Sequence, residues 1–284
     1  MRPVTPPVPD SLSVPQQKIF TTLRSVGRGA AADTKSHIKP VSELQRSPGS
    51  TQGSDGDWYE ILLQEVEINA KTCHHDDTNP SDDPTWGFSV FVTSYSPGAQ
   101  EKLPQALENW IGAQELWLEH HIMNPVFRDE VITRFKLDVV YDDSLEGASY
   151  DRIRAEFRAW MAGLGLTARG DESPPLVRVS MLPNPKENIC LVLDETSITM
   201  LAGLTFTGNL EGDFARFESM NVRAIDCTWR RTAEVNSNDT WRGIGDLSIV
   251  GLAVLFVMVA APVRGYSEMG MMHDLHPLAG MPDY

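Results

Sequence analysis

One segment near the end of the chain limits what this sequence can fold into more than any other. The 17 residues LSIVGLAVLFVMVAAPV, from Leu247 to Val263, include no charged side chain. A helix needs roughly 20 apolar residues to cross a bilayer, within a range of about 17–25, so the run is just long enough. It has no polar stripe to face water, which excludes an ordinary surface helix. The run is therefore either a membrane-spanning helix or a fully buried part of a folded core.

The residues around this run give the membrane alternative an orientation. Three arginines lie before the run and one after it, namely Arg230, Arg231, Arg242 and Arg264. The positive-inside rule then puts the main domain in the cytosol, with a membrane contact through the stretch from Leu247 to Val263. The N-terminus has no apolar signal segment, so we do not expect secretion. The sequence predicts a cytoplasmic domain, tail-anchored in a membrane if this alternative holds.

Charge and cysteine content exclude several classes of protein. The formal net charge is −15 over 284 residues, and basic side chains are concentrated in residues 1–50. A nucleic-acid binder or a polybasic membrane-surface protein needs an excess of Lys and Arg, so we expect neither. The three cysteines, Cys73, Cys190 and Cys227, are odd in number and widely spaced, which favours free thiols in a reducing compartment. We expect a protein partner whose identity the sequence does not indicate.

Composition divides the chain into four parts. Residues 1–55 are rich in Pro and Ser and almost free of aromatic side chains, so a disordered tail is predicted there. Residues 56–243 are predicted to form an α+β domain. Residues 244–263 form the apolar segment, a candidate transmembrane helix. Residues 264–284 form a short C-terminal tail.

Apolar periodicity in the domain predicts alternating helices and strands. Helices are expected at 57–68, 103–121, 149–165 and 196–203, and strands at 86–94, 134–143, 188–195 and 222–229. For residues 57–68 a strand is the alternative. In the first strand Trp86, Phe88 and Val90 alternate with polar Ser89, which is typical of a strand with one buried face. Strands covered on both faces should instead be continuously apolar. The sequence therefore predicts a two-layer ferredoxin-like α+β sandwich, with helices on one face of a mainly four-stranded sheet.

Four segments together resemble a family of uncharacterised filamentous-fungal proteins. They are WGFSVFVTSYSPGAQEKLPQALENWI, FKLDVVYDDSLEGASYDRIRAEFRAWMAG, ICLVLDETSITML and VRAIDCTWRR, within roughly residues 85–245. The shared pattern is a Trp-Gly-Phe strand, an FRxW helix, a CLxxDE strand-helix unit and a last strand that ends in Trp. The resemblance implies one intact domain. It implies no activity and no catalytic residues.

Acidic residues follow two of the predicted strands. Asp142 and Asp143 come after the second strand, and Asp194 and Glu195 come after the third. Carboxylates at such positions hold Mg²⁺ in phosphoryl-transfer enzymes. Acidic side chains at the same positions also cap the following helix, and Asp194 before Thr196 and Ser197 fits this alternative. The four acids are the candidate catalytic residues of a small metal-dependent hydrolase.

A second group of residues has the chemistry of zinc ligands. Cys73, His74 and His75 are adjacent, and His120 with His121 ends a predicted helix. A zinc site needs three or four ligands that converge on one ion, so the two segments would have to meet. The alternative is an exposed polar loop. No cofactor motif is present.

The main functional expectation follows from the lack of a specific catalytic motif. We expect a non-enzymatic interaction or binding protein, C-terminally membrane-anchored if the apolar run spans a bilayer. The small metal-dependent hydrolase is the alternative.

Overall fold

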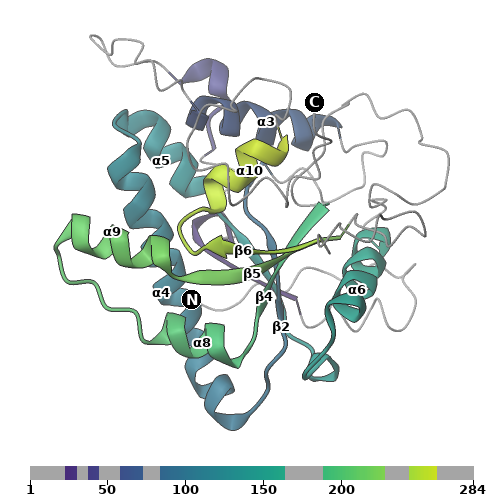
Figure 1. Cartoon of the computed structure of the whole chain (residues 1–284). Helices are drawn as coiled ribbons and strands as arrows, with labels where there is room; N and C mark the ends of the chain where they lie inside the picture. The colour runs from purple at the N-terminus through teal and green to yellow at the C-terminus, as the bar shows by residue number, and fades with distance from the viewer. Residues whose placement is uncertain are drawn as a thin grey trace, which may run out of the picture.

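A computed structural model describes residues 23–30, 38–44, 58–72, 84–163, 188–227 and 243–260. The strands are β1 (Leu23–Val26), β2 (Ser89–Val92), β3 (Leu137–Val140), β4 (Ile189–Leu193), β5 (Asn221–Asp226) and β6 (Ile244–Ser248). The α-helices are α3 (Trp58–Thr72), α4 (Pro97–His121), α5 (Pro125–Arg134), α6 (Tyr150–Gly163), α8 (Glu195–Ala202), α9 (Leu210–Ser219) and α10 (Leu252–Ala260). Three short 3-10 helices are η1 (Arg28–Ala30), η2 (Val41–Glu43) and η3 (Asp143–Leu145). The described chain is a mixed α+β fold (Figure 1).

The strands form one open mixed sheet of six, in the order β1-β3-β2-β4-β5-β6. The central strands β3, β2 and β4 are parallel, so their carboxyl ends meet at one edge of the sheet. The outer strands β1, β5 and β6 each pair antiparallel with a neighbour. The α+β class is confirmed, whereas a ferredoxin-like sandwich with four strands is not.

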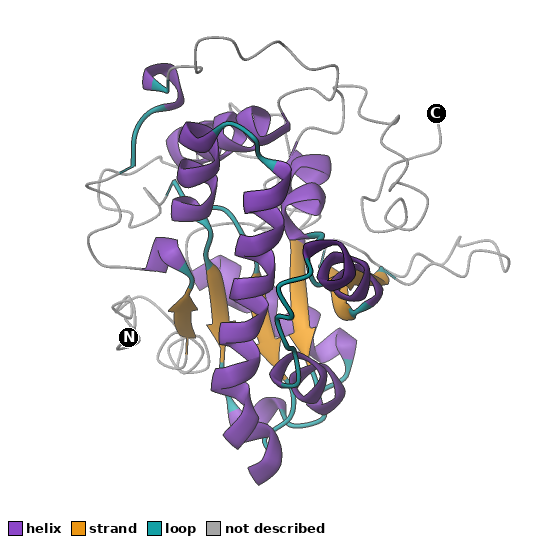
Figure 2. Cartoon of the chain, turned by 90° about the vertical axis from the view of Figure 1, so that its left-hand side faces the viewer, coloured by secondary structure: helices purple, strands orange, loops and turns teal. Residues whose placement is uncertain are grey.

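Helices cover both faces of this sheet, which corrects the prediction of one covered face. Helices α3, α4, α5, α8, α9 and α10 contribute to one apolar cluster, and α6 forms the other cluster on the opposite face. Figure 1 shows α6 apart from the other helices, and Figure 2 shows the larger helical layer in front of the sheet. The alternation of Trp86, Phe88 and Val90 is confirmed, because all three face the larger cluster. Phe91, however, is fully buried against Phe157 of α6.

Strand β1 lies within the range predicted to be disordered. Leu23 pairs with Val140 and Val26 with Leu137, so β1 forms the antiparallel edge of the sheet next to β3. A strand this short has a weak signal in the sequence, because the partner strand supplies its hydrogen bonds. Residues 1–22, 31–37 and 45–55 of the predicted tail lie outside the described residues.

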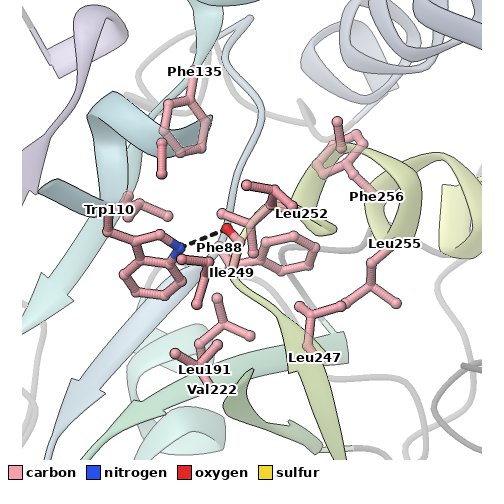
Figure 3. Packing of buried hydrophobic residues seen from close by; sticks show 14 of the residues in the cluster. Phe88, Trp110, Phe135, Leu191, Val222, Leu247, Ile249, Leu252, Leu255 and Phe256 are labelled. Carbon is pink, nitrogen blue, oxygen red and sulfur yellow. Dashed lines mark hydrogen bonds between the residues drawn. The ribbon is translucent and has the colours of Figure 1, made fainter. Parts of the chain in front are cut away.

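The apolar run is divided between a strand and a helix. Its first residues end β6, Ile249 and Val250 form a turn, and α10 follows from Leu252. Leu247, Leu252 and Phe256 are at most 1% exposed and belong to the larger core cluster (Figure 3). Of the helices that the structure describes, none has both the length and the apolar character to cross a bilayer. Residues 261–263 and the tail at 264–284 lie outside the described range.

Two tryptophans fix this segment and its neighbours by hydrogen bonds as well as by packing. The Trp110 indole Nε1 donates to the carbonyl oxygen of Ile249 at 2.8 Å, which ties α4 to the turn before α10 (Figure 3). The Trp86 indole donates to the carbonyl oxygen of Val131 in α5 at 2.7 Å. Buried indole N–H groups need such partners, so each tryptophan fixes one position of the helical layer.

A buried arginine joins three segments at the C-terminal end of α5. The Arg134 guanidinium is fully buried and contacts Glu67 of α3 at 3.2 Å and Glu130 of α5 at 3.3 Å. It also donates to the carbonyl oxygen of Lys39, and Glu67 accepts the N–H of Val41 at 2.7 Å. Residues 38–44 are therefore held against α3 and α5 by one ionic network.

Candidate functional site

The site lies where the chain leaves the parallel strands. After β2 the chain enters α4 on the larger helical face, and after β3 it enters η3 and then α6 on the opposite face. In open α/β sheets, ligands bind where neighbouring strands send their connections to opposite faces. We call residues 93–96, 141–148 and 194–195, which follow β2, β3 and β4, the carboxyl edge. It includes all four acids that the sequence singled out.

Tyr95 packs between the two diverging connections. Its ring is partly buried against both apolar clusters and lies 4.9 Å, centroid to centroid, from the ring of Tyr141. Its hydroxyl donates to the carbonyl oxygen of Val92 at 3.0 Å and accepts the N–H of Asp142 at 2.7 Å. A further bond, from Gly147 N–H to the Thr93 carbonyl oxygen at 2.9 Å, joins the same two connections. Tyr95 thus fixes the β3–α6 connection to the end of β2.

The backbone and side chain around Tyr95 also hold two exposed carboxylates. The Tyr95 N–H donates to the carboxylate of Glu146, and the hydroxyl of Ser96 donates to Glu195 at 3.1 Å. The Ser96 hydroxyl also accepts the N–H of Ala99 at 3.2 Å and so caps α4. Glu146 and Glu195 come from different connections, yet they are anchored to neighbouring residues of the β2–α4 loop. The carboxyl edge is therefore a fixed acidic surface.

Asp142 and Asp194 each bind backbone rather than each other. Asp142 Oδ1 accepts the N–H of Ser144 at 3.0 Å and caps η3. Asp194 Oδ1 accepts the N–H of Ser197 at 2.8 Å and caps α8, which confirms the capping alternative for this residue. Asp194 is exposed whereas Asp142 is only 5% exposed. Asp143 is exposed in the first turn of η3, and Glu195 is exposed in the first turn of α8.

The two histidines of the predicted zinc group lie at the other end of α4. Since α4 has 25 residues and rises about 1.5 Å per residue, His120 and His121 are roughly 35 Å from its start at the carboxyl edge. The ring of His121 stacks on Trp117 at 4.1 Å, and the ring of His120 lies 4.8 Å from Phe214. Cys73, His74 and His75 lie outside the described residues. In the described part of the chain, no three His, Cys, Asp or Glu side chains are grouped so that they could hold a metal ion.

Tyr95, Ser96 and Glu146 were not predicted as site residues. The sequence does contain a signal for Ser96, because a serine before a proline is typical of a helix N-cap followed by the first helical residue. The prediction instead started this helix at residue 103, beside Pro104, which lies inside α4. No local pattern indicates Tyr95 or Glu146, because their roles depend on which connections the fold brings together.

Ionisation of Tyr95 predicts a loss of stability at alkaline pH. Burial, reinforced by the nearby Asp142 carboxylate, raises the pKa of the Tyr95 phenol well above its usual value of about 10. Above pH 10 an unfolded chain loses this proton while the folded chain keeps it, so the contribution to stability is full below pH 10 and decreases above it. Urea unfolding of the wild type at pH 9 and pH 11 should show this decrease. Part of it should be missing in Tyr95→Phe; an equal decrease in both proteins would contradict the assignment to Tyr95.

The resemblance to a family of filamentous-fungal proteins, described above, rests on sequence pattern alone. Its segments correspond to β2 with α4, β3 with α6, β4 with α8, and β5. No family model matches this chain, and comparisons with curated proteins and with solved structures find no similar protein.

Proposed function

We propose that this chain is a non-catalytic binding protein whose carboxyl edge recognises a basic segment of a protein partner. This proposal depends on the position of Tyr95. Its ring and hydroxyl occupy the place where two connections diverge, and its bonds fix the loops on both sides. The edge therefore offers an outward acidic surface for a partner.

The carboxylates of the edge suit recognition better than proton transfer. Asp142 and Asp194 are engaged as acceptors of backbone N–H groups, and Glu146 and Glu195 are anchored to Tyr95 and Ser96. Glu146, Asp194 and Glu195 are exposed and each is held in one orientation, so a partner would bind them without the entropy cost of ordering long acidic side chains. Such preordered acceptors complement lysine and arginine side chains.

Net charge points to the same kind of partner. The formal charge of −15 attracts cationic segments and raises their rate of association. The half-buried rings of Tyr95 and Tyr141 lie among these carboxylates and add aromatic surface, which favours contact with an arginine or lysine side chain. Arg24 of β1 already lies 5.5 Å above the ring of Tyr141. The edge thus combines charge with a surface on which guanidinium groups stack.

Neutralising two exposed acids of the edge should weaken binding of a basic probe. We would measure the anisotropy of a fluorescein-labelled peptide rich in lysine and arginine, titrated with the full chain. The double variant Asp143→Asn/Glu195→Gln is expected to raise Kd at least about fivefold, because each lost charge contact contributes roughly 0.5 kcal/mol. The titration is carried out at about 0.15 M salt, because charges more than about 8 Å apart are then largely screened.

A matched control separates local recognition from overall charge. Glu108→Gln/Glu119→Gln removes the same charge from exposed positions about 16 and 33 Å along α4 from its first residue. We expect this variant to change Kd less than twofold. If both double variants weaken binding equally, the peptide responds only to net charge and the proposed recognition surface is wrong.

A further inference from the structure

Two cysteines meet inside the smaller apolar cluster, between the sheet and α6. Cys190 lies in β4, and Cys227 directly follows β5, its antiparallel neighbour. Both side chains are fully buried, and their sulfur atoms are 3.4 Å apart. Since this is a contact distance, no other group separates the two sulfur atoms. The sequence predicted free cysteines, and both are thiols in this structure.

The backbone on both sides of the pair is held firmly. The Cys227 N–H donates to the carbonyl oxygen of Asn188 at 2.7 Å, which extends the β4–β5 pairing to the cysteine. The Arg158 guanidinium of α6 donates to the Cys227 carbonyl oxygen at 3.0 and 2.8 Å. Arg154 donates to the carbonyl oxygens of Asp226 at 3.1 Å and Gly243 at 3.0 Å. The two sulfur atoms are therefore held as neighbours by the fold.

We infer that Cys190 and Cys227 form a pair that a peroxide slowly converts to an intramolecular disulfide. One thiolate attacks the O–O bond of hydrogen peroxide, which gives a sulfenic acid and releases hydroxide. The second thiolate then attacks that sulfur, the S–S bond forms, and a second hydroxide leaves. With the two thiol protons, the products are one disulfide and two waters. The sulfur atoms have to approach from 3.4 Å to about 2.05 Å for the bond to form.

Burial sets the rate of this reaction. Desolvation, and next the hydrogen bond with Cys227, raise the pKa of the Cys190 thiol well above its ordinary value. Thiolate, the reactive form, is therefore scarce at neutral pH, and oxidation in the folded protein should be slow. The rate should rise about tenfold per pH unit below that pKa, because the thiolate fraction rises in this proportion.

The test follows the thiols of the folded full chain in hydrogen peroxide. A Cys73→Ser background leaves only the pair, and intact mass with peptide mapping identifies the product. We expect a loss of about 2 Da and a peptide cross-linked between Cys190 and Cys227. The disulfide would close a loop between positions 37 residues apart, so the oxidised protein should melt on the order of 5 °C or more higher than the reduced one.

A second variant tests whether the loss of 2 Da and the cross-link need both cysteines of the pair. Cys73→Ser/Cys227→Ala leaves Cys190 alone and should gain oxygen atoms or stay unchanged, with no cross-link. The inference is overturned if both thiols of the Cys73→Ser protein gain oxygen atoms, as sulfinic or sulfonic acids, and the protein does not lose 2 Da. It is equally overturned if both thiols stay free in the folded protein while they oxidise in urea, or if Cys73 cross-links to one of them in the wild type.

Discussion

Replacement of Phe256 by alanine is expected to lower the free energy of unfolding by about 3–5 kcal/mol. Phe256 of α10 is 1% exposed, and its ring makes edge contacts with Trp86 at 6.1 Å and Phe88 at 6.0 Å between centroids. Alanine would leave a cavity between α10 and the sheet, because the surrounding aromatic rings are themselves fully buried and relax only in part. Urea unfolding followed by tryptophan fluorescence measures the loss.

Val254 provides the matched control on the same helix. Its side chain is only partly buried, so Val254→Ala should cost less than about 1.5 kcal/mol. The comparison tests whether α10 packs on the sheet, because a helix that does not pack there would lose a similar amount of stability at both positions. Equal, small losses for the two variants would show that α10 is not a part of the core.

This segment also shows how far periodicity alone can be used. A short apolar run gives the same signal whether it forms a buried strand, a buried helix or both. The run contains the end of β6, a turn at Ile249 and Val250, and then α10. The pairing of Leu247 with Val222 and of Ser248 with Asn221 in β5 separates the strand from the helix that follows. That pairing is a tertiary contact, which a local pattern cannot contain.

The fold class could be predicted because its strongest elements have strong local patterns. Trp86, Phe88 and Val90 alternate as a strand should, and the predicted helix over 149–165 is α6, Tyr150–Gly163. The prediction that helices cover only one face of the sheet was wrong because Ser89 was interpreted as facing solvent, although it is 2% exposed. A small hydroxyl side chain fits under a helix, so a polar residue in an alternating strand does not establish an open face.

The site could be predicted only in part, for a related reason. Asp142 and Asp194 were found because each directly follows a predicted strand, which the sequence pattern alone contains. Tyr95 could not be found in this way. Its importance comes from the divergence of the connections after β2 and β3, and this depends on which face each helix covers.

Removing the charge of Arg134 should destabilise the protein about as much as removing Phe256, for a different reason. Arg134→Met keeps the volume of the side chain but leaves Glu67 and Glu130 without their common cation. The breaking of a buried ion pair by loss of one partner costs about 3–5 kcal/mol, since the remaining charge stays poorly hydrated. Urea unfolding measures this cost.

Two further variants test this reasoning. Arg128→Met removes an exposed partner of Asp129 on the same helix and should cost less than about 1 kcal/mol. Adding Glu67→Gln and Glu130→Gln to Arg134→Met should restore part of the stability, because glutamine still accepts the N–H groups of Val41 and Lys39 but brings no charge. If Arg134→Met costs no more than Arg128→Met, the N-terminal segment at 38–44 does not depend on the buried guanidinium. If the added substitutions lower stability further, the cost of Arg134→Met comes from lost packing and not from the two uncompensated carboxylates.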